Sequence, residues 1–381
     1  MDYKPFCDTE IIFSSKKELE DTILSLDMAN ILLVMSESSV KRWDMKLFVT
    51  ELKEKCVLLG GTLIWINSIT ANPTQNDLIK ALKYIGSNKI DVVIAVGGGS
   101  SIDLAKGISA FYDIDKNNTY TLDEITNDIK DKSYYGNKHI DIIAIPSTAG
   151  TGSELTQWAT IWDDNKSGKF SIDDPMLKPK KAIIVPELTI SMLPIMTLST
   201  GLDAMCQAVE AYWSVHTTPI VQDLSYRAVE LIIHNLHKAI YEPDNIIVRE
   251  KLCRGAVMAG LAFSQTRTTA CHSISYPLTM LHNIPHGLAV AITLDSVAQI
   301  NKGHYKNDNE LMDLFNIYNG ISGFIKYVCK DITVMKLSSF GITSTDDIEN
   351  IVNHAFTGGR MDNNPVKLDK NDVREILHSI M

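Results

Sequence analysis

Short and almost entirely apolar runs recur through the first half of the chain, and they constrain its fold more than any other feature. The runs are NILLVM (30–35), GTLIWIN (61–67), DVVIAVGGG (91–99), DIIAIPST (141–148) and KAIIVPE (181–187). Such runs are typical of strands buried on both faces of a parallel sheet. Helix-length segments lie between them, for example 74–86 and 100–112, so the pattern predicts the βαβ succession of a doubly wound sheet.

The pattern changes near residue 188. Segments 224–240, 248–265 and 310–329 have the apolar spacing of helices, and no strand pattern follows. A chain of 381 residues is also too long for one small core. We therefore predict an α/β domain over residues 1–187 and an all-α domain over residues 188–381, with the ligand expected in a cleft between them.

Charge and cysteine content narrow the classes of partner. The formal net charge of -10 argues against nucleic acid or an anionic membrane as the main partner. The six cysteines form no CxxC motif, which favours reduced thiols in a cytoplasmic protein. The segment MDYKPFCDTE lacks the pattern of a signal peptide, and no apolar run is long enough to span a bilayer.

The segment VIAVGGGSSIDLAKGIS (93–109) combines a strand, a glycine run and a helix. Gly97, Gly98 and Gly99 would let the backbone approach a pyrophosphate, and the helix expected from Ser100 would offer free N–H groups to its charge. The alternative is a tight βα turn that needs glycine for its geometry alone. The spacing is not the GxGxxG fingerprint.

The next strand is followed by IPSTAGTGSELTQWATI (145–161). Its hydroxyls lie between glycines and could hold phosphate or ribose oxygens. They belong to Ser147, Thr148, Thr151 and Ser153. Its place at the carboxyl end of a strand favours ligand binding over the alternative, an exposed polar turn.

The segment DIDKNNTYTLDE (113–124) partly matches the calcium loop of an EF-hand. Acids or amides occupy loop positions 1, 3 and 5, and Glu124 occupies position 12. Asn118 replaces the glycine that the sharp turn requires, and the preceding helix belongs to the α/β half. Calcium binding is therefore not expected.

Polar side chains recur in the helical half. Asp203 and Gln207 are four residues apart in STGLDAMCQAVEAYWS (199–214), so they share one helix face. On this segment alone, a hydrogen-bonded pair near the start of a buried helix is the simpler interpretation.

ACHSISYPLTMLHNIPHGLAVAI (270–292) adds His272 and His286, in a segment that Pro277 and Pro285 are expected to bend. Each histidine alone would be structural. Together with Asp203 they form a nitrogen and oxygen set that suits Fe²⁺, Zn²⁺ or Mn²⁺.

The order GGGSSIDLAK, STAGTGSE, GLDAMCQAVEAYWS and CHSISYPL…NIPHG resembles the iron-containing (group III) alcohol dehydrogenase family over nearly the whole chain. NPT (72–74) and DNNP (362–365) are similar landmarks. The resemblance implies a Rossmann-like dinucleotide-binding domain followed by a helical metal-binding domain. It also implies hydride transfer between NAD or NADP and an alcohol/aldehyde pair over a divalent metal, Fe²⁺ in the first place and Zn²⁺ as the alternative.

The family holds its metal with one Asp and three His. Asp203, His272 and His286 match three of these positions, and Gln207 stands where the fourth would be a histidine. An amide oxygen binds transition metals more weakly than imidazole and favours harder ions. Tyr276 stands where many members carry a second histidine near the nicotinamide, and it is the candidate proton donor.

The same resemblance assigns the cofactor-binding residues. They are Gly97, Gly98, Gly99, Ser100, Asp103, Ser147, Thr148, Thr151 and Lys169, the last of which matches a family lysine near the cofactor. NAD-preferring members often carry an Asp after the first strand, and Ser36 stands there, followed by Glu37. The sequence therefore leaves both NADH and NADPH open.

Within the family, FSQTRTTACHSISYPLT, LDAMCQAVEAYWS and WDDNKSGKFS resemble the phosphonoacetaldehyde reductases, also called 2-hydroxyethylphosphonate dehydrogenases. Arg267 would then contact the phosphonate, because a guanidinium matches the geometry of such oxyanions. A surface ion pair is the alternative for Arg267. The resemblance implies reduction of phosphonoacetaldehyde to 2-hydroxyethylphosphonate in a homodimer or higher homo-oligomer.

Three other functions compete with this one. A general short-chain alcohol or diol dehydrogenase would share every motif except a role for Arg267. A non-catalytic nucleotide-binding protein would follow if Gln207 marks a decayed metal site. A lyase of the dehydroquinate-synthase type would need more basic residues around the metal than the sequence contains.

Overall fold

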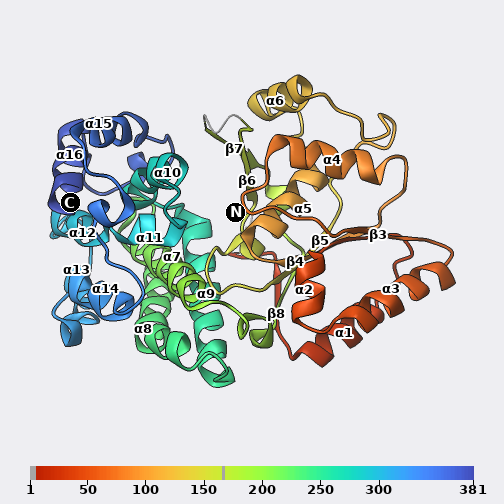
Figure 1. Ribbon diagram of the computed structural model, residues 1–381, viewed down its shortest axis with the longest axis horizontal. Helices are drawn as coiled ribbons and strands as arrows, with labels where there is room; N and C mark the ends of the chain where they lie inside the picture. Colours follow the sequence, from red (N-terminus) through yellow and green to blue (C-terminus); the bar gives the residue numbers. More distant parts are fainter. Residues whose placement is uncertain (1–5, 165–167) are drawn as a thin grey trace. The chain divides into compact units, whose positions relative to one another are not determined.

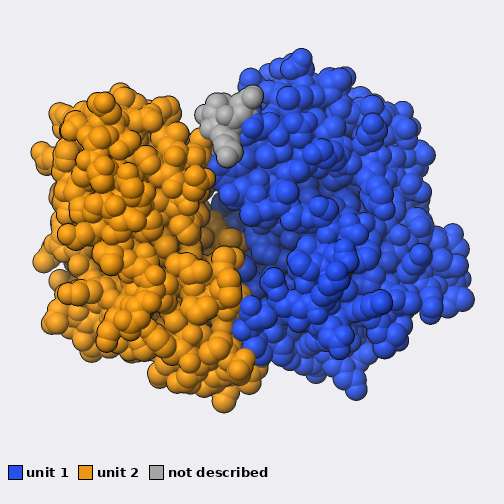
Figure 2. Space-filling view, in the orientation of Figure 1, with its two compact units in different colours: residues 1–148, 153–191 blue, residues 149–152, 192–381 orange. Residues whose placement is uncertain are grey.

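The computed structural model of the protein describes residues 6–164 and 168–381, and its chain divides into two compact units. The first unit comprises residues 1–148 and 153–191, and the second comprises residues 149–152 and 192–381 (Figure 2). The predicted domain limits, 1–187 and 188–381, stay a prediction because compactness does not show that either part folds alone. No described helix is long and apolar enough to cross a membrane.

A parallel sheet of six strands forms the centre of the first unit. The strands in spatial order are β1 (Glu10–Phe13), β8 (Lys181–Ile184), β5 (Ile142–Pro146), β4 (Val92–Gly97), β2 (Ile31–Val34) and β3 (Leu63–Ile66). All five apolar runs of the first half form strands of this sheet. The sequence reading missed β1, which is only four residues long and lies at an edge.

Helices cover both faces of the sheet, which explains why the strands are apolar without alternation (Figure 1). Leu32 and Val34 of β2 face one core cluster, and Ile31 and Leu33 face the other. The first cluster includes α4 (Gln75–Ile85), α5 (Gly99–Phe111) and α6 (Leu122–Asp131), and the second includes α1 (Lys16–Leu24), α2 (Glu37–Arg42) and α3 (Lys46–Leu58).

A hairpin of β6 (Trp158–Trp162) and β7 (Lys169–Asp173) was not predicted. Its inner residues Ala159, Ile161 and Ile172 pack in the same cluster as α4, α5 and α6. Burial alternates along WATIW, as in a half-buried strand, but Thr160 is its one polar residue, so the sequence lacks the alternation that would have predicted the strand.

The loop 113–124 is held by hydrogen bonds within its own segment. Asn118 is fully buried, accepts the Asp113 N–H at 2.7 Å and donates to the Gly86 carbonyl at 2.6 Å. Glu124 forms a capping box with Thr121 at the start of α6. The polar groups that resembled calcium ligands are therefore used within the loop.

The second unit is helical, which confirms the predicted class. Its helices are α7 (Pro194–Trp213), α8 (Pro219–Tyr241), α9 (Ile246–Thr266), α10 (Ala270–His282), α11 (His286–Ala291), α12 (Leu294–Asn301), α13 (Asp308–Asp313), α14 (Ile321–Cys329), α15 (Thr345–His354) and α16 (Lys370–Ser379). Short 3₁₀ turns join the helices and strands of the two units: η1 (Ser153–Leu155), η2 (Pro175–Leu177), η3 (Pro186–Thr189), η4 (Asn316–Tyr318), η5 (Leu337–Phe340) and η6 (Met361–Asn363).

Two local predictions for this unit are wrong. Segment 310–329 is not one helix, because Asn319 and Gly320 adopt positive φ values of 62° and 98° between η4 and α14. Pro277 does not bend the chain sharply but lies inside α10. The turn comes instead at Asn283, whose φ of 54° ends that helix before Pro285.

Candidate functional site

Asp203, His272 and His286 meet in the second unit. One ligand atom from each lies within 4.8 Å of the others, the one such group of potential metal ligands among the described residues. Asp203 Oδ1 lies 3.2 Å from His272 Nε2 and 4.0 Å from His286 Nε2. With metal–ligand bonds of about 2.0–2.2 Å, two ligands of one ion can lie up to roughly 4 Å apart. The two distances from Asp203 therefore fit a shared cation.

The packing of α7 explains how these side chains are presented. Almost the whole helix is buried, yet Ser199, Asp203, Gln207 and Glu210 follow one face at helical spacing. Gly287 in the first turn of α11 lies so close to α7 that a Cβ there would meet the Ser199 carbonyl oxygen at 1.7 Å. Only glycine permits this approach, which places His286 beside the polar face of α7.

Gln207 lies on the same face and is 4 % exposed. Its amide nitrogen hydrogen-bonds Asp203 and reaches the Thr151 carbonyl oxygen at 3.5 Å. Its Oε1 is buried and has no hydrogen-bond partner in the described part of the chain. A buried unpaired carbonyl oxygen is costly unless something binds it, so Gln207 fits the fourth position of a metal site through this atom.

Glu210 completes the site, and the sequence reading missed it. Its fully buried carboxylate accepts a hydrogen bond from the Cys271 N–H at 2.7 Å and another from the Thr269 hydroxyl at 2.8 Å. It also contacts His272 Nδ1, which leaves Nε2 directed at Asp203. Carboxylates that hold the outer nitrogen of a histidine in this way orient metal ligands. The signal was its position seven residues after Asp203, two helical turns along the same face.

The electrostatics of the group favour positive charge between the carboxylates. Burial works against a charged Asp203, but the hydrogen bond from His272 and the nearby His286 hold the pKa of Asp203 below its usual value. Burial also opposes a charged His272, yet Glu210 and Asp203 raise the pKa of His272 to about 10. The same negative charge of Asp203 and Glu210 would stabilise a bound divalent cation.

Tyr276 lies one turn after His272 in α10 and is buried. Its ring is nearly parallel to that of His286, with an angle of 4° and 6.1 Å between ring centroids. Tyr276 therefore lies beside His286, one of the candidate metal ligands.

The glycine loop lies at the carboxyl end of β4, next to β2. The connection from β2 leads to β3 on one side and the connection from β4 leads to β5 on the other, so the strand order reverses here. Ligands of open α/β sheets bind outside the strand ends at such a point. Gly97 has a φ of 153°, and a Cβ there would meet Ser101 Oγ at 2.2 Å. Gly98 caps α5, which begins at Gly99, one residue earlier than predicted.

Ser147 and Thr148 lie next to this loop within the first unit. The Ser147 N–H donates to the Gly97 carbonyl oxygen at 2.9 Å, and a Cβ on Gly98 would contact the Thr148 methyl group at 3.4 Å. The NPT landmark reaches the same place, since the Asn72 N–H donates to the Ser100 hydroxyl at 3.0 Å. The structure thus gathers most of the predicted cofactor-binding residues.

Three predicted cofactor-binding residues are not part of this group around the glycine loop. Thr151 belongs to the second unit and contacts Gln207 there. The backbone of Lys169 lies in β7, but its side chain is outside the described part of the structure. Asp103 accepts hydrogen bonds from the Ser153 hydroxyl at 2.6 Å and the Thr160 N–H at 3.0 Å, so its carboxylate supports the loop between β5 and β6.

Lys106 supports the same loop and was not predicted. It is fully buried, and its Nζ donates to the Ser153 carbonyl at 2.6 Å, the Trp158 carbonyl at 2.9 Å and the Thr156 hydroxyl at 3.2 Å. Burial lowers its pKa to about 8 despite the attraction of Asp103 and Glu154. Lys106 follows Asp103 by three residues in IDLAK, which was the available signal.

Ser36 comes directly after β2, the strand beside the glycine loop. It caps α2 by accepting the Ser39 N–H, and Glu37 pairs with Lys41 at 2.8 Å. No carboxylate therefore occupies residue 36, and Glu37 is engaged on the exposed face of α2.

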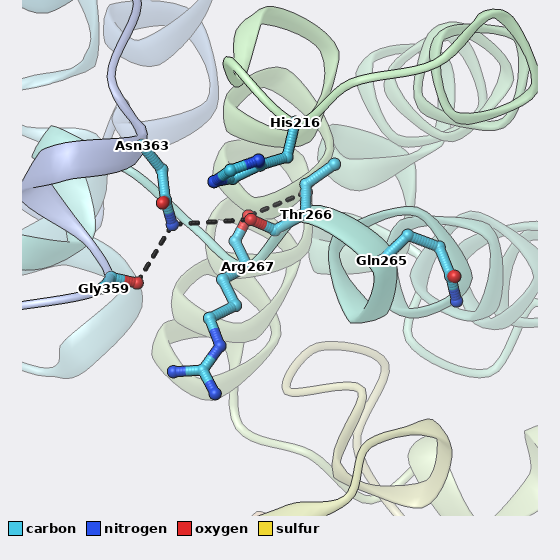
Figure 3. A pocket seen from close by; sticks show the side chains of 6 residues that line it. All are labelled: His216, Gln265, Thr266, Arg267, Gly359 and Asn363. Atoms are coloured by element: carbon cyan, nitrogen blue, oxygen red, sulfur yellow. Dashed lines mark hydrogen bonds between the residues drawn. The ribbon is translucent and has the colours of Figure 1, made fainter.

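Arg267 lines a cavity of about 410 Å³ in the second unit (Figure 3). The other lining residues are His216, Gln265, Thr266, Gly359 and Asn363, so no carboxylate lines it among the described residues. The side chain of Arg267 extends along this cavity from the junction between α9 and α10 (Figure 3). A guanidinium in the same lining as an imidazole suits an oxyanion.

Comparison with known proteins agrees with these features. Residues 9–186 match the iron-containing alcohol dehydrogenase family model, and residues 197–381 match the model of the family's C-terminal part. The NADPH-dependent butanol dehydrogenase of Clostridium saccharobutylicum is 31% identical over 296 residues, 76% of this chain and 72% of that one. The phosphonoacetaldehyde reductase of Streptomyces viridochromogenes is 34% identical over 233 residues, 60% of this chain and 58% of that reductase.

A solved structure covers the whole fold. The sulfoacetaldehyde reductase from Bifidobacterium kashiwanohense, in complex with NAD⁺, aligns with a TM-score of 0.83 at 27% identity over 100% of this chain and 99% of that one. The order of glycine loop, aspartate helix and paired histidines, together with both family models, leads to one conclusion. The chain belongs to the iron-containing alcohol dehydrogenase family, whose enzymes are NAD(P)-dependent and metal-dependent oxidoreductases acting on alcohols and aldehydes.

Proposed function

We propose that the enzyme reduces a short aldehyde that carries an oxyanion, and specifically phosphonoacetaldehyde to 2-hydroxyethylphosphonate. The observation that carries this proposal is the cavity around Arg267, which presents donors and no carboxylate among its described lining residues. Because the protein has a net charge of -10, its surface as a whole repels anions, and this cavity is an exception that favours an anion. A general alcohol dehydrogenase would have no use for it.

Two relatives support the same class of substrate. The Streptomyces viridochromogenes reductase is named for an aldehyde with a phosphonate, and the Bifidobacterium kashiwanohense reductase for one with a sulfonate. Sulfoacetaldehyde is therefore the second candidate substrate. The two anions differ in charge, since a phosphonate carries one to two negative charges and a sulfonate one, so a direct comparison of both aldehydes separates the candidates.

We assign the metal site to Asp203, Gln207, His272 and His286, with Fe²⁺ as the expected ion and Zn²⁺ as the alternative. We assign the pyrophosphate of NAD or NADP to the loop from Gly97 to Ser100, with Asp103, Ser147, Thr148, Thr151 and Lys169 as the further cofactor-binding residues. When bound, the metal would polarise the aldehyde oxygen and the nicotinamide would supply the hydride.

The protein's own contribution is mainly to position the reactants. Asp203 and Glu210 hold His272 so that its Nε2 faces the site. Tyr276, buried beside His286, is the proposed proton donor to the alcohol oxygen. Arg267 is proposed to hold the oxyanion end of the substrate.

Replacing Arg267 by alanine tests the proposal. A charge-assisted contact is worth about 1.5–3 kcal/mol, and each 1.4 kcal/mol is a factor of ten. Arg267→Ala should therefore lower kcat/KM for phosphonoacetaldehyde about ten- to a hundredfold and leave kcat/KM for propanal nearly unchanged. Both are measured by nicotinamide absorbance with each cofactor and with added Fe²⁺ or Zn²⁺.

A folding defect would lower both activities alike, so the uncharged aldehyde is the internal control. Equal losses, or no loss, would remove Arg267 from substrate binding and favour a general short-chain alcohol or diol dehydrogenase. No turnover of any aldehyde with any metal would favour a non-catalytic nucleotide-binding protein.

We also propose that the enzyme is a homodimer or higher homo-oligomer. The support is β1, an edge strand of the sheet with no strand on its outer side among the described residues. Such an edge can pair with a second copy. Light scattering of the purified protein tests this, and a monomeric mass at micromolar concentration would contradict it.

A further inference from the structure

The backbone of Arg267 has a conformation that side chains rarely adopt. Its φ is 60° and its ψ is -178°, in a region that is almost exclusive to glycine. A non-glycine residue there costs about 1–3 kcal/mol and persists only where its surroundings enforce it. The chain nevertheless places an arginine at this point, directly after the end of α9.

One side chain holds both flanks of this residue. Asn363 Nδ2 donates to the carbonyl oxygens of Thr268 at 3.1 Å and of Thr266 at 3.4 Å, the residues on either side of Arg267. Figure 3 shows Asn363 beside Thr266 and Arg267. Asn363 is 5 % exposed, so these contacts compete little with water. The Arg267 N–H itself donates to the Phe263 carbonyl at 2.7 Å.

Asn363 also holds the surface beside the guanidinium. Its Nδ2 donates to the Gly359 carbonyl oxygen at 2.9 Å, and a Cβ on Gly359 would lie 3.4 Å from Arg267 Nη1 (Figure 3). The backbone carbonyl oxygen of Asn363 accepts the Val215 N–H at 3.0 Å, which fixes the main chain of the asparagine from a third segment. A single amide thus links the backbone of Arg267 to the segment that its side chain runs along.

We infer that Asn363 is a positioning residue, which holds Arg267 in a glycine-type conformation and thereby fixes its guanidinium in the cavity for an oxyanion. This gives a role to the DNNP landmark, residues 362–365, which the catalytic site does not use. The oxyanion as ligand rests on the proposed function, whereas the enforced backbone conformation does not.

A double-mutant cycle of thermal stability tests the backbone part. If Asn363 enforces the strain, Asn363→Ala lets Arg267 relax, and the gain offsets part of the lost hydrogen bonding. Glycine at residue 267 has no strain to release, so Asn363→Ala should lower Tm more in an Arg267→Gly background than in the wild type. The expected difference is about 2–6 °C. Equal losses in the two backgrounds would overturn the inference.

Asn364 provides the matched control. It is equally buried, but its amide donates to Asn301 and to the Val366 carbonyl, each at 2.8 Å, and not to residues 266–268. Asn364→Ala should lower Tm equally in both backgrounds. Coupling of the same size for Asn364 would mean that any loosening of this segment acts on Arg267, and it would overturn the specific role of Asn363.

Titration with methylphosphonate tests the ligand part by calorimetry. Asn363→Ala should weaken its Kd about tenfold and Arg267→Gly should abolish binding, while Asn364→Ala should leave the Kd unchanged. A wild-type protein that does not bind methylphosphonate, or an Asn363→Ala variant that binds it normally, would overturn the inference. If methylphosphonate binds as expected and the stability cycle is coupled, yet phosphonoacetaldehyde is no better a substrate than propanal, the proposed function fails and this inference stands.

Discussion

The two candidate sites of this molecule are built from different materials. The glycine loop of the first unit offers backbone N–H groups at the start of α5, and its Gly97 is needed because a Cβ would not fit there. The polar group of the second unit consists of buried side chains on α7, α10 and α11, each held by a specific partner. Cofactor binding at the glycine loop should therefore be lost when a side-chain atom is added to a glycine. Metal binding at the second site should be lost when a hydrogen bond to one of its ligands is changed.

This difference also governs how each site binds its ligand. A helix N-terminus and a tight turn suit a diphosphate, whose charge is spread over several oxygens. A metal ion needs a few strong ligands at fixed distances, so it depends on the tautomer and orientation of each histidine. Four substitutions test this difference between the two sites, in order of decreasing effect.

The backbone site should be most sensitive at Gly97. Gly97→Ala introduces a Cβ 2.2 Å from Ser101 Oγ at a φ of 153°, so the turn must distort. Strain of about 1–3 kcal/mol together with this clash should weaken NADH binding about a hundredfold, as measured by fluorescence titration. Gly60→Ala is the control, because Gly60 also has a positive φ of 78° but no atom within 4 Å of the new Cβ. Comparable weakening in both variants would show that loss of stability alone is responsible.

The side-chain site should be most sensitive at Glu210. Glu210→Gln preserves shape but places an NH₂ group among donors, and an amide that donates to His272 Nδ1 would put the proton on Nε2. Metal affinity, measured by competition with a chelator, should fall about 10–100-fold. Glu310→Gln, on an acid that accepts a hydrogen bond from the Tyr212 hydroxyl, should leave metal affinity unchanged. Normal metal affinity in Glu210→Gln would mean that Glu210 only stabilises the fold.

Gln207 tests whether the side-chain site is complete. Gln207→His replaces an unpaired amide oxygen by an imidazole, which binds transition metals more strongly. Affinity for Zn²⁺ should rise about tenfold, roughly 1.4 kcal/mol. Unchanged affinity for Zn²⁺ would place residue 207 outside the ligands of the metal.

Ser36 is the position near the glycine loop where a side chain should affect the preference between NADH and NADPH. Ser36→Asp keeps a capping residue on α2 but adds a negative charge near the expected ribose. Repulsion of up to about 1 kcal/mol at this half-buried position should raise KM for NADPH up to roughly fivefold relative to NADH. Ser36→Asn, an uncharged capping residue of the same shape, should leave the ratio of the two KM values unchanged. An equal shift in both variants would exclude a charge effect.

Periodicity predicted most of the first unit because its strands are buried on both faces. β2, β3, β4, β5 and β8 each coincide with an apolar run, and the glycine loop follows β4 as expected. β1 was too short to stand out, and the hairpin of β6 and β7 was obscured by the loop reading of STAGTGSELTQWATI. In the second unit, helical spacing predicted α8 and α9, but it could not show that Asn319 and Gly320 interrupt segment 310–329.

Local periodicity and motif order are properties of the chain, and they were enough to predict the fold class, the family and the potential metal ligands. The partners of the functional residues follow only from the folded arrangement: Glu210 contacts His272, Lys106 supports the loop after β5, and Asn363 holds the residues on either side of Arg267. These contacts join residues that are up to about a hundred positions apart, and spacing along the chain has no information about them. Burial then decides their strength, because a hydrogen bond or charge excluded from water is costly to leave unpaired.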